Sequence, residues 1–327
     1  MLAFIQKSLK SLWVSPLRGA GILGINARNI EYIFPGNPRE LFPQVDDKLR
    51  TKEIAESLEI PFPKTYGVIR FQNEVKQLSE MISGKDSFVI KPAGGSGGNG
   101  ILVIKDVKDD DDFRKPSGSR LNLGDLDYHI HNILSGMFSI SGKKDVAFIE
   151  ETVTFDPIFD EITYLGVPDL RVIIYHGVPV MAMLRLPSKA SDGKANLHKG
   201  GLGVGIDIAT GQTLEGIQYN RYVKVHPDTD GTLQGREIPH WPKILDIAAK
   251  LGDHTDFAYL GIDIVLDKEK GPLLLEMNAR PGLSIQIANK AGLLPRLQKV
   301  DDKVSLLKTV DDKIEFAKET FRVKPSG

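Results

Sequence analysis

The stretch FAYLGIDIVLDKEKGPLLLEMNARPG, residues 257–282, indicates the architecture of the chain because it reads as one β-hairpin. Two apolar runs, residues 260–266 and 273–277, flank a polar turn at residues 267–271, and this arrangement is a hairpin signal. We therefore expect an antiparallel pair of strands here, with side chains alternating between two faces.

The register of this hairpin brings three polar side chains onto one face. With Glu269 and Lys270 at the centre of the turn, Asp263 pairs with Glu276, and Asn278 shares the face of Glu276. Facing carboxylates destabilise a sheet unless positive charge lies between them, so a divalent cation explains the pair economically. Oxygen ligands without His or Cys favour Mg²⁺, with Mn²⁺ as the alternative, over zinc. A second interpretation stays open, in which both carboxylates are solvated positions of an edge hairpin.

The composition is that of an ordinary globular chain. Of 327 residues, 41% are hydrophobic and 26% are charged, and 42 basic side chains nearly balance 43 acidic ones. This balance gives no general attraction to nucleic acid. The absence of cysteine excludes disulfides, thiolate metal sites and a cysteine nucleophile, and it fits a cytoplasmic protein. No apolar run approaches the roughly 20 residues that span a bilayer.

The first 16 residues, MLAFIQKSLKSLWVSP, place apolar side chains at near-helical spacing around two lysines. They predict an amphipathic helix that packs on the body of the protein. A helix lying on a membrane surface is the less favoured alternative. The segment lacks the continuous apolar core of a secretory signal.

A glycine-rich loop lies between two short apolar runs at residues 88–104, FVIKPAGGSGGNGILVI. Glycines allow positive φ angles and leave no side chain between the backbone and a ligand, so successive N–H groups can surround phosphate oxygens. Lys91, at the end of the first run, would add positive charge. The loop lacks the Gly-Lys-Ser/Thr ending of a Walker motif. A flexible linker has a similar composition and is the alternative interpretation.

Other segments predict the supporting elements. Asp46 or Asp47 caps a helix that continues to Leu58. Residues 105–115 are rich in aspartate and predict an exposed loop. Residues 191–207 form a long polar, glycine-rich stretch of the kind that often serves as a lid.

A second hairpin is expected at residues 170–187, LRVIIYHGVPVMAMLRLP, with its turn at His176 and Gly177. We expect it to leave Asp169 and Arg171 near one end and Arg185 toward the other.

Taken in order, these segments resemble the ATP-grasp superfamily, and specifically the alpha-L-glutamate ligase-like proteins related to the RimK-type ligases. The resemblance rests on DKLRTKEIAESLEIPFPKTY, FVIKPAGGSGGNGI, HIHNILSGMFSI, DLRVIIYHGVPVMAMLRLP, DGKANLHKGG and GIDIVLD…LLLEMNARPGLSIQIAN. It implies an α+β chain with the ATP-grasp fold, in which ATP lies between two antiparallel sheets with flanking helices. The expected divisions are a short N-terminal segment (1–45), an ATP-grasp domain (46–292) with a lid subdomain (about 86–150), and a C-terminal helical tail (293–327).

The resemblance also implies the roles of individual residues. By motif position, ATP would be bound by Lys48, Lys91, Gly95, Ser96, Gly97, Gly98, Glu150, Glu151, Val153 and, at the ribose, Asp156. Two Mg²⁺ ions would be held by Asp263, Glu276 and Asn278. The reacting groups would be lined by Arg185, Asn196, Lys199 and Arg280. Too few residues precede Lys48 for the full N-terminal domain of the RimK type, so substrate recognition is expected to differ.

The activity that follows is ATP-dependent ligation of a carboxylate to an amine through an acyl phosphate, with glutamate or another amino acid as the added group. The partners expected are small-molecule or peptide substrates and no nucleic acid, and a homo-oligomer stays open. Two alternatives remain: a phosphotransferase acting on an alcohol, and a non-catalytic nucleotide-binding protein.

Overall fold

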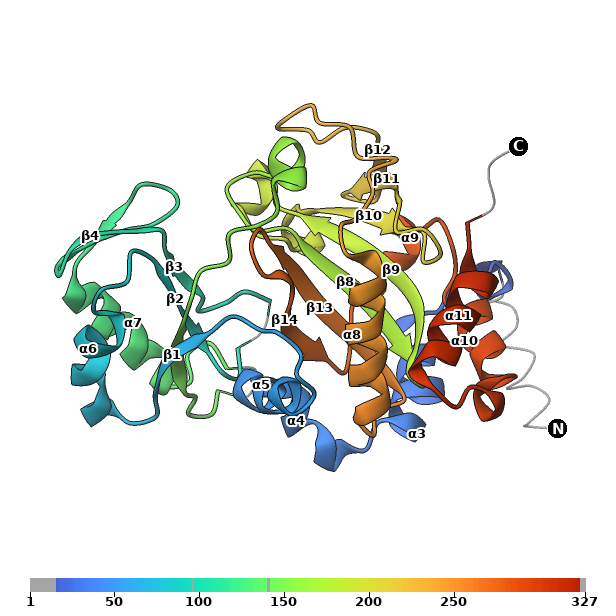
Figure 1. Ribbon diagram of the computed structural model, residues 1–327, viewed down its shortest axis with the longest axis horizontal. Coiled ribbons are helices and arrows are strands. Elements are labelled where there is room, and N and C mark those ends of the chain that lie inside the picture. Colours follow the sequence, from blue (N-terminus) through green and yellow to red (C-terminus); the bar gives the residue numbers. More distant parts are fainter. Residues whose placement is uncertain (1–15, 96, 140–141, 324–327) are drawn as a thin grey trace.

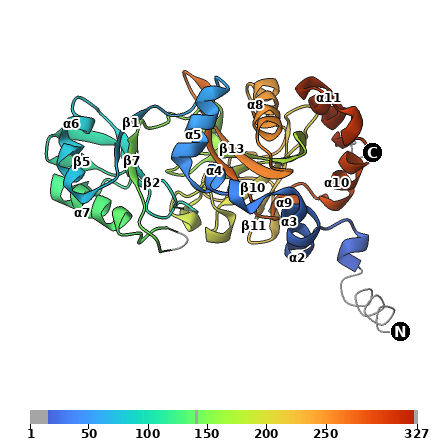
Figure 2. The same cartoon turned by 90° about the horizontal axis from the view of Figure 1, so that it is seen from below.

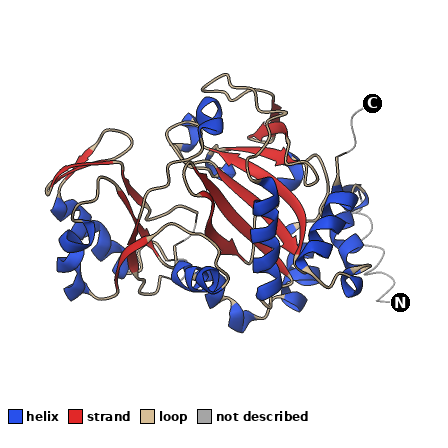
Figure 3. Cartoon of the chain, in the orientation of Figure 1, coloured by secondary structure: helices blue, strands red, loops and turns tan. Residues whose placement is uncertain are grey.

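The computed structural model describes residues 16–95, 97–139 and 142–323. The apolar residues of the predicted N-terminal helix lie outside this part. Within it, the strands form two main antiparallel sheets, set side by side along the long axis of the molecule, and one small sheet (Figures 1 and 3). The α+β class and the two-sheet arrangement predicted from the sequence are confirmed. The predicted division into three segments stays a prediction.

The larger sheet has seven strands. In spatial order they are Arg221–Val223 (β12), Thr213–Gln218 (β11), Leu202–Ile206 (β10), Val178–Leu186 (β9), Asp169–Tyr175 (β8), Tyr259–Asp267 (β13) and Gly271–Asn278 (β14). The central strands are almost continuous apolar runs, as expected for strands buried on both faces. The helix Trp241–His254 (α8) packs against β8, β9 and β13, and the short helix Ile285–Ala288 (α9) packs against β9, β10 and β11. β14 is an edge strand on the side that faces the smaller sheet (Figure 1).

The β13–β14 hairpin pairs Asp263 with Glu276, as the sequence predicted, although its turn and its register near Asp263 differ from the prediction. The turn has three residues instead of two, because Asp267 pairs with Gly271. The Asp267 carboxylate accepts the N–H groups of both Glu269 and Lys270 at 3.0 Å, and Gly271 takes a positive φ of 73°. An irregularity in the pairing next to Asp263 then restores the predicted partner.

The β8–β9 hairpin turns at His176 and Gly177, both with positive φ, as predicted. The expectation that Asp169 and Arg185 occupy opposite ends was wrong, because the register pairs these two residues directly. In a hairpin the two ends of the sequence meet at the open end, so residues far apart in the chain become cross-strand neighbours.

The smaller sheet has the order Thr65–Ile69 (β1), Ala147–Glu150 (β7), Phe88–Pro92 (β2) and Leu102–Ile104 (β3). The β2–β3 pair confirms the predicted strand, glycine loop and strand, and Gly97, Gly98 and Gly100 adopt positive φ angles. The helices Leu78–Ile82 (α6) and Leu123–Leu134 (α7) belong to this half of the molecule and bury apolar side chains in its core.

Residues 105–115 are not the exposed loop that their charge predicted. They contribute Asp106–Asp109 (β4) and Asp112–Arg114 (β5), which form the small sheet with Arg120–Leu121 (β6). Phe113 is buried in an edge-to-face contact with Phe88, so one apolar side chain fixes an otherwise charged segment as a hairpin.

A helix connects the two halves. Lys48–Ser57 (α5) begins at Asp47, whose carboxylate accepts the Leu49 N–H at 2.9 Å, so one of the two predicted caps is confirmed. Together with Pro43–Asp46 (α4), it packs against β14, and in Figure 2 it lies between the two sheets.

The remaining helices are short or lie at the two ends of the described chain. They are Ile25–Ala27 (α2), the π-helix Arg28–Ile33 (η1), Phe34–Gly36 (α3), Arg39–Leu41 (η2), Gln72–Gln77 (η3), Pro157–Ile162 (η4), Lys189–Ser191 (η5), Leu197–Lys199 (η6), Leu294–Asp301 (α10), Val304–Leu306 (η7) and Val310–Phe321 (α11). None of the helices described combines the length and apolar character needed to cross a lipid bilayer.

Candidate active site

A small pocket with both polar and apolar lining residues lies where the glycine loop meets β14. Its volume is about 150 Å³. It is lined by Phe42, Val45, Asp46, Lys48, Gly95, Gly97, Glu276, Met277, Asn278, Ala279 and Arg280. Six of the residues predicted from the sequence therefore converge here, although they come from a helix, a loop and a strand that are far apart in the chain.

Lys48 links the three walls of the pocket. As the first residue of α5, it donates its backbone N–H to the Ala93 carbonyl at 3.1 Å. Its ammonium group donates to the Gly95 carbonyl in the glycine loop and lies 3.7 Å from the Glu276 carboxylate on β14. The side chain thus holds the glycine loop against the edge of the larger sheet.

The floor of the pocket carries a carboxylate and an amide oxygen. The Glu276 side chain is 30% exposed, with the long contact to Lys48 as its ion pair. The Asn278 side-chain oxygen accepts the backbone N–H of Arg280 at 2.8 Å, which fixes the amide next to the pocket. The Arg280 guanidinium stacks over the Phe42 ring at 4.9 Å from the centroid.

Asp263, the cross-strand partner of Glu276, belongs to a buried ion-pair network. Arg171 donates to both oxygens of Asp263, at 2.7 and 2.5 Å, and Arg185 donates to one of them at 2.7 Å. Arg185 also binds Asp169. Two guanidinium groups therefore place positive charge at Asp263, and its predicted contact with a metal ion stays a prediction.

The network shifts the pKa values of its members. Burial favours a raised pKa for Asp263, but the charges of Arg171 and Arg185 outweigh it and lower the pKa overall. For Asp169, nearby positive charge does not offset the effect of burial. Burial and the neighbouring negative charge of Asp263 raise its pKa to about 6, although Arg185 opposes this rise. Burial also disfavours the charged form of Arg185, yet its two carboxylate partners raise its pKa.

Glu276 and Asn278 are the oxygen donors that fit a magnesium ion. Both face the pocket, and carboxylate and amide oxygens are hard ligands of the kind Mg²⁺ prefers. Among the residues described, no three His, Cys, Asp or Glu side chains gather in a metal-binding group. A magnesium ion here would therefore take part of its coordination from a substrate and from water, as Mg²⁺ commonly does.

A second charged cluster lies between the sheets at the end of β7. The Glu150 carboxylate, 2% exposed, binds Lys91 through one oxygen and Lys52 through the other, the latter at 2.7 Å. Lys52 also donates to the Pro63 carbonyl at 2.7 Å and to the Thr65 hydroxyl at 2.9 Å, which uses all three of its protons. Burial favours a raised pKa for Glu150, but the two lysines outweigh it and lower the pKa. Burial lowers the pKa of Lys52.

The segment after β7 runs from the smaller sheet to the larger one and contains three predicted nucleotide ligands. The Glu151 N–H donates to the Lys64 carbonyl at 2.9 Å, and its carboxylate binds the Lys270 ammonium at 2.5 Å. Val153 is half-buried in the same segment. Asp156 caps η4, because its carboxylate accepts the Ile158 N–H at 3.0 Å. Its predicted contact with the ribose stays a prediction.

The long loop after β9 meets the glycine loop. The Lys199 ammonium donates to the Asn99 side chain at 3.0 Å and to the Gly97 carbonyl at 3.4 Å. The Asn196 side chain accepts the His198 N–H at 3.0 Å and thereby caps η6. Ser96 lies outside the described residues.

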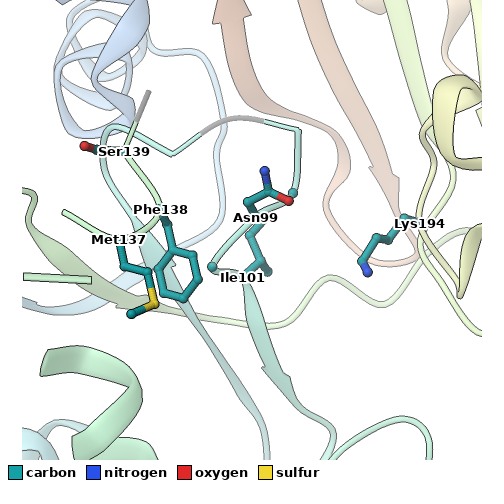
Figure 4. Close-up of a pocket in the computed structure, with 8 residues that line it drawn as sticks. Asn99, Ile101, Met137, Phe138, Ser139 and Lys194 are labelled. Carbon is teal, nitrogen blue, oxygen red and sulfur yellow. The ribbon is translucent and has the colours of Figure 1, made fainter. Parts of the chain in front are cut away.

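A wider cavity of about 520 Å³ lies beside the glycine loop, with Gly98 among its lining residues. Figure 4 shows Asn99 and Ile101 between Met137 and Phe138 on one side and Lys194 on the other. Gly98 therefore lines this wider cavity, whereas Gly95 and Gly97 line the small pocket.

Two residues of the site were missed by the sequence analysis. Lys52 follows Lys48 by four positions and therefore shares its helix face, a signal that was available. Arg171 was noted without a role, because its partner Asp263 lies on a strand 92 positions away. Only the strand order, which pairs β8 with β13, brings them together.

Several solved structures show similarity at low sequence identity. The D-cycloserine synthetase DcsG is 14% identical, with 82% of this chain and 73% of that chain covered and a TM-score of 0.48. An L-amino acid ligase from Bacillus licheniformis is 11% identical (78% and 45% covered, TM-score 0.42). The D-alanyl-alanine synthetase A from Vibrio cholerae is 11% identical (85% and 65% covered, TM-score 0.44). No curated protein matches the sequence.

A family model described as sugar-transfer associated ATP-grasp matches residues 27–302. The match confirms the ATP-grasp superfamily and fold, whereas the alpha-L-glutamate ligase-like subgroup stays a prediction. It covers the two main sheets, the glycine loop and every residue that lines the small pocket. The chain therefore belongs to the sugar-transfer associated ATP-grasp family.

Proposed function

We propose that this protein is an ATP-dependent ligase that joins a carboxylate to an amine through an acyl phosphate. The observation that carries the proposal is the small pocket at the meeting of the two sheets. It gathers the Lys48 ammonium, the glycine loop, the Glu276 and Asn278 oxygens and the Arg280 guanidinium around one space. These are the groups needed to bind a phosphate chain, hold its metal ion and receive a second anion.

ATP would place its phosphates toward Lys48 and Lys91 and its adenine toward the segment of Glu151 and Val153. The pocket of about 150 Å³ is smaller than the roughly 300–1,000 Å³ of typical small-molecule sites. It therefore suits the reacting end of the nucleotide and a small acceptor, with the base held elsewhere between the sheets.

Glu276 and Asn278 would hold Mg²⁺, which neutralises the charge that develops on the transferring phosphoryl group. Asp263 would support them from the neighbouring strand, where it pairs with Glu276 and where Arg171 and Arg185 hold its carboxylate.

In the first step, an oxygen of the substrate carboxylate attacks the γ-phosphorus. The bond from that phosphorus to the β,γ-bridging oxygen breaks, and ADP leaves. In the second step, the nitrogen of a neutral amine attacks the acyl carbon, phosphate leaves with the bonding electrons, and the nitrogen loses a proton. Lys48 and Arg280 would stabilise the anionic groups, while Arg185, Asn196 and Lys199 would line the acyl side. The glycine loop would exclude water from the reactive anhydride.

The test is an assay of ADP release with hydroxylamine as the amine. Only an enzyme that forms an acyl phosphate converts a carboxylic acid into a hydroxamate. The acids tested should include amino acids, short peptides and, following the description of the family, sugar acids. We expect at least one acid to give ADP and hydroxamate in equal amounts. ADP release with alcohols and no hydroxamate would identify a phosphotransferase, and ATP binding without ADP release under all conditions would identify a nucleotide-binding protein.

Replacing Lys52 by methionine is expected to weaken ATP binding about tenfold, although Lys52 itself has no free proton for the nucleotide. In the wild type, Glu150 shares its charge between Lys52 and Lys91, so the three groups carry one net positive charge. Without Lys52, Glu150 neutralises Lys91 alone and less positive charge remains for the phosphates. Calorimetric titration with ATP checks this expectation.

The matched control for this variant is Lys76→Met, at an exposed position of η3. It removes the same charge from the surface and should leave the ATP dissociation constant unchanged. Equal ATP affinity in Lys52→Met and wild type would contradict the role assigned to the cluster.

A further inference from the structure

The short segment before α5 forms one wall of the small pocket. Phe42 and Val45 line it from the ends of η2 and α4, and Asp46 is the last residue of α4. None of these three residues belongs to the strands or to the glycine loop. Because α4 packs against β14, the wall is held in a fixed position opposite Glu276 and Asn278. The segment before α5 therefore contributes an acidic side chain to the pocket, in addition to the apolar side chains of Phe42 and Val45.

Asp46 brings a negative charge to this wall. Partial burial raises the pKa of its carboxylate, and the positive charges of Arg280 and Lys48 oppose this rise. Among the described residues, no hydrogen bond or ion pair is formed by this carboxylate, and Arg280 in particular lies beyond ion-pair distance. Asp46 is thus an acidic group at a pocket wall with its hydrogen-bonding capacity available to a ligand.

Arg280 brings positive charge to the same end of the pocket. Its backbone N–H is fixed by Asn278, and its guanidinium lies on the Phe42 ring. Arg28, which is 6% exposed, donates to the Pro281 carbonyl at 2.6 Å and supports the turn that follows Arg280. The charge of Arg280 contributes to a lowered pKa for Arg28, after the larger effect of burial. Within the described chain, neither guanidinium is paired with a carboxylate, and Arg280, which lines the pocket, is therefore available to an anionic group of a substrate.

We propose that the space between Asp46 and Arg280 binds the acyl-donor substrate, and that this substrate is a small carboxylic acid carrying a cationic amine. The carboxylate would be oriented by Arg280, and the ammonium group would donate to Asp46. The inference rests on the proposed ligase function and specifies which acid the ligase activates.

The two ends of the subsite explain why both charges are needed on the substrate. An acid without an amine would leave the Asp46 carboxylate unpaired beside a bound anion, and the two negative charges would repel each other. A diamine without a carboxylate would leave Arg280 unpaired and would carry no oxygen to attack the γ-phosphorus. The site would therefore select its substrate in two ways: by its attractive contacts with both charged groups, and by the unpaired charge that a substrate lacking one of these groups would leave in the site.

The experiment compares matched acids in the hydroxamate assay with the full-length protein. Each amino acid is paired with the same acid lacking the amine, for example alanine with propionate and glutamate with glutarate, and kcat/KM is measured for both. We expect wild type to prefer the amine-bearing member of an active pair by about tenfold to a hundredfold, the range for hydrogen bonds to charged groups. In Asp46→Asn, which keeps the shape and removes the charge, this ratio should fall to near one.

The matched control is Glu56→Gln, an exposed position on α5. It should keep the wild-type ratio, because its side chain lies outside the pocket lining. A wild-type enzyme that activates both members of each pair equally, or an unchanged ratio in Asp46→Asn, would overturn the subsite while leaving the ligase function intact. Absence of hydroxamate from every acid would instead count against the ligase function and the subsite together.

Discussion

Replacement of Glu276 by glutamine is expected to lower the rate of ADP release by about 10²–10³-fold, the scale seen when a preorganised electrostatic contact is removed from an active site. The amide keeps the shape of the side chain and one oxygen, but it loses the charge that would hold Mg²⁺ against the phosphates. Glu276 lies on the pocket floor beside Asn278, and its ion pair with Lys48 is long, at 3.7 Å. The side chain is therefore available to a metal ion.

The same substitution should leave the fold nearly unchanged. A partly exposed ion pair of this length is worth about 0–1 kcal/mol, so urea unfolding should give a free energy close to that of the wild type. Glu269→Gln, in the exposed turn of the same hairpin, is the matched control and should retain full activity. More than a tenth of the wild-type rate in Glu276→Gln would be incompatible with the role that we assign to this carboxylate.

Replacement of Asp263 by asparagine is expected to give the largest loss of stability, about 3–5 kcal/mol in the free energy of unfolding. Asp263 is 1% exposed and receives three hydrogen bonds from Arg171 and Arg185. Without its charge, the guanidinium of Arg171 is left buried without its carboxylate partner, and Arg185 keeps only Asp169. The cost arises mainly from this uncompensated buried charge.

Urea denaturation followed by circular dichroism measures this loss. Asp246→Asn, which removes a surface i,i+4 pair with Lys250, is the control and should cost no more than about 0.5 kcal/mol. If Asp263→Asn changed the unfolding free energy by less than 1 kcal/mol, roughly the worth of one ordinary hydrogen bond, the network would not be the structural support that its geometry indicates.

Much of the local structure follows from the sequence. Alternating and continuous apolar runs, His176-Gly177 and the polar turn before Gly271 predict the two hairpins of the larger sheet. The glycines after Pro92 predict a loop with positive φ angles, and Asp47 predicts the start of α5. These features depend on neighbouring residues, because turn chemistry and strand period act over a few positions.

Some local predictions failed where one side chain outweighed the average composition. Residues 105–115 look like a charged loop, yet the burial of Phe113 against Phe88 makes them a hairpin. The turn of the β13–β14 hairpin has three residues, because the Asp267 carboxylate accepts two N–H groups within it. In both cases a specific contact decides the structure.

The sequence by itself determined several elements of this protein: the two hairpins of the larger sheet, the glycine loop, the first turn of α5 and the oxygen-bearing face of β14. Only the tertiary structure decided which charges meet, as in the pairing of Arg171 with Asp263, of Lys52 with Glu150, and of the N-terminal wall with Arg280. The physical reason is that side-chain period and turn chemistry are properties of adjacent residues. Charge partners depend instead on strand order and on the packing of α4 and α5 against β14, which no local pattern encodes.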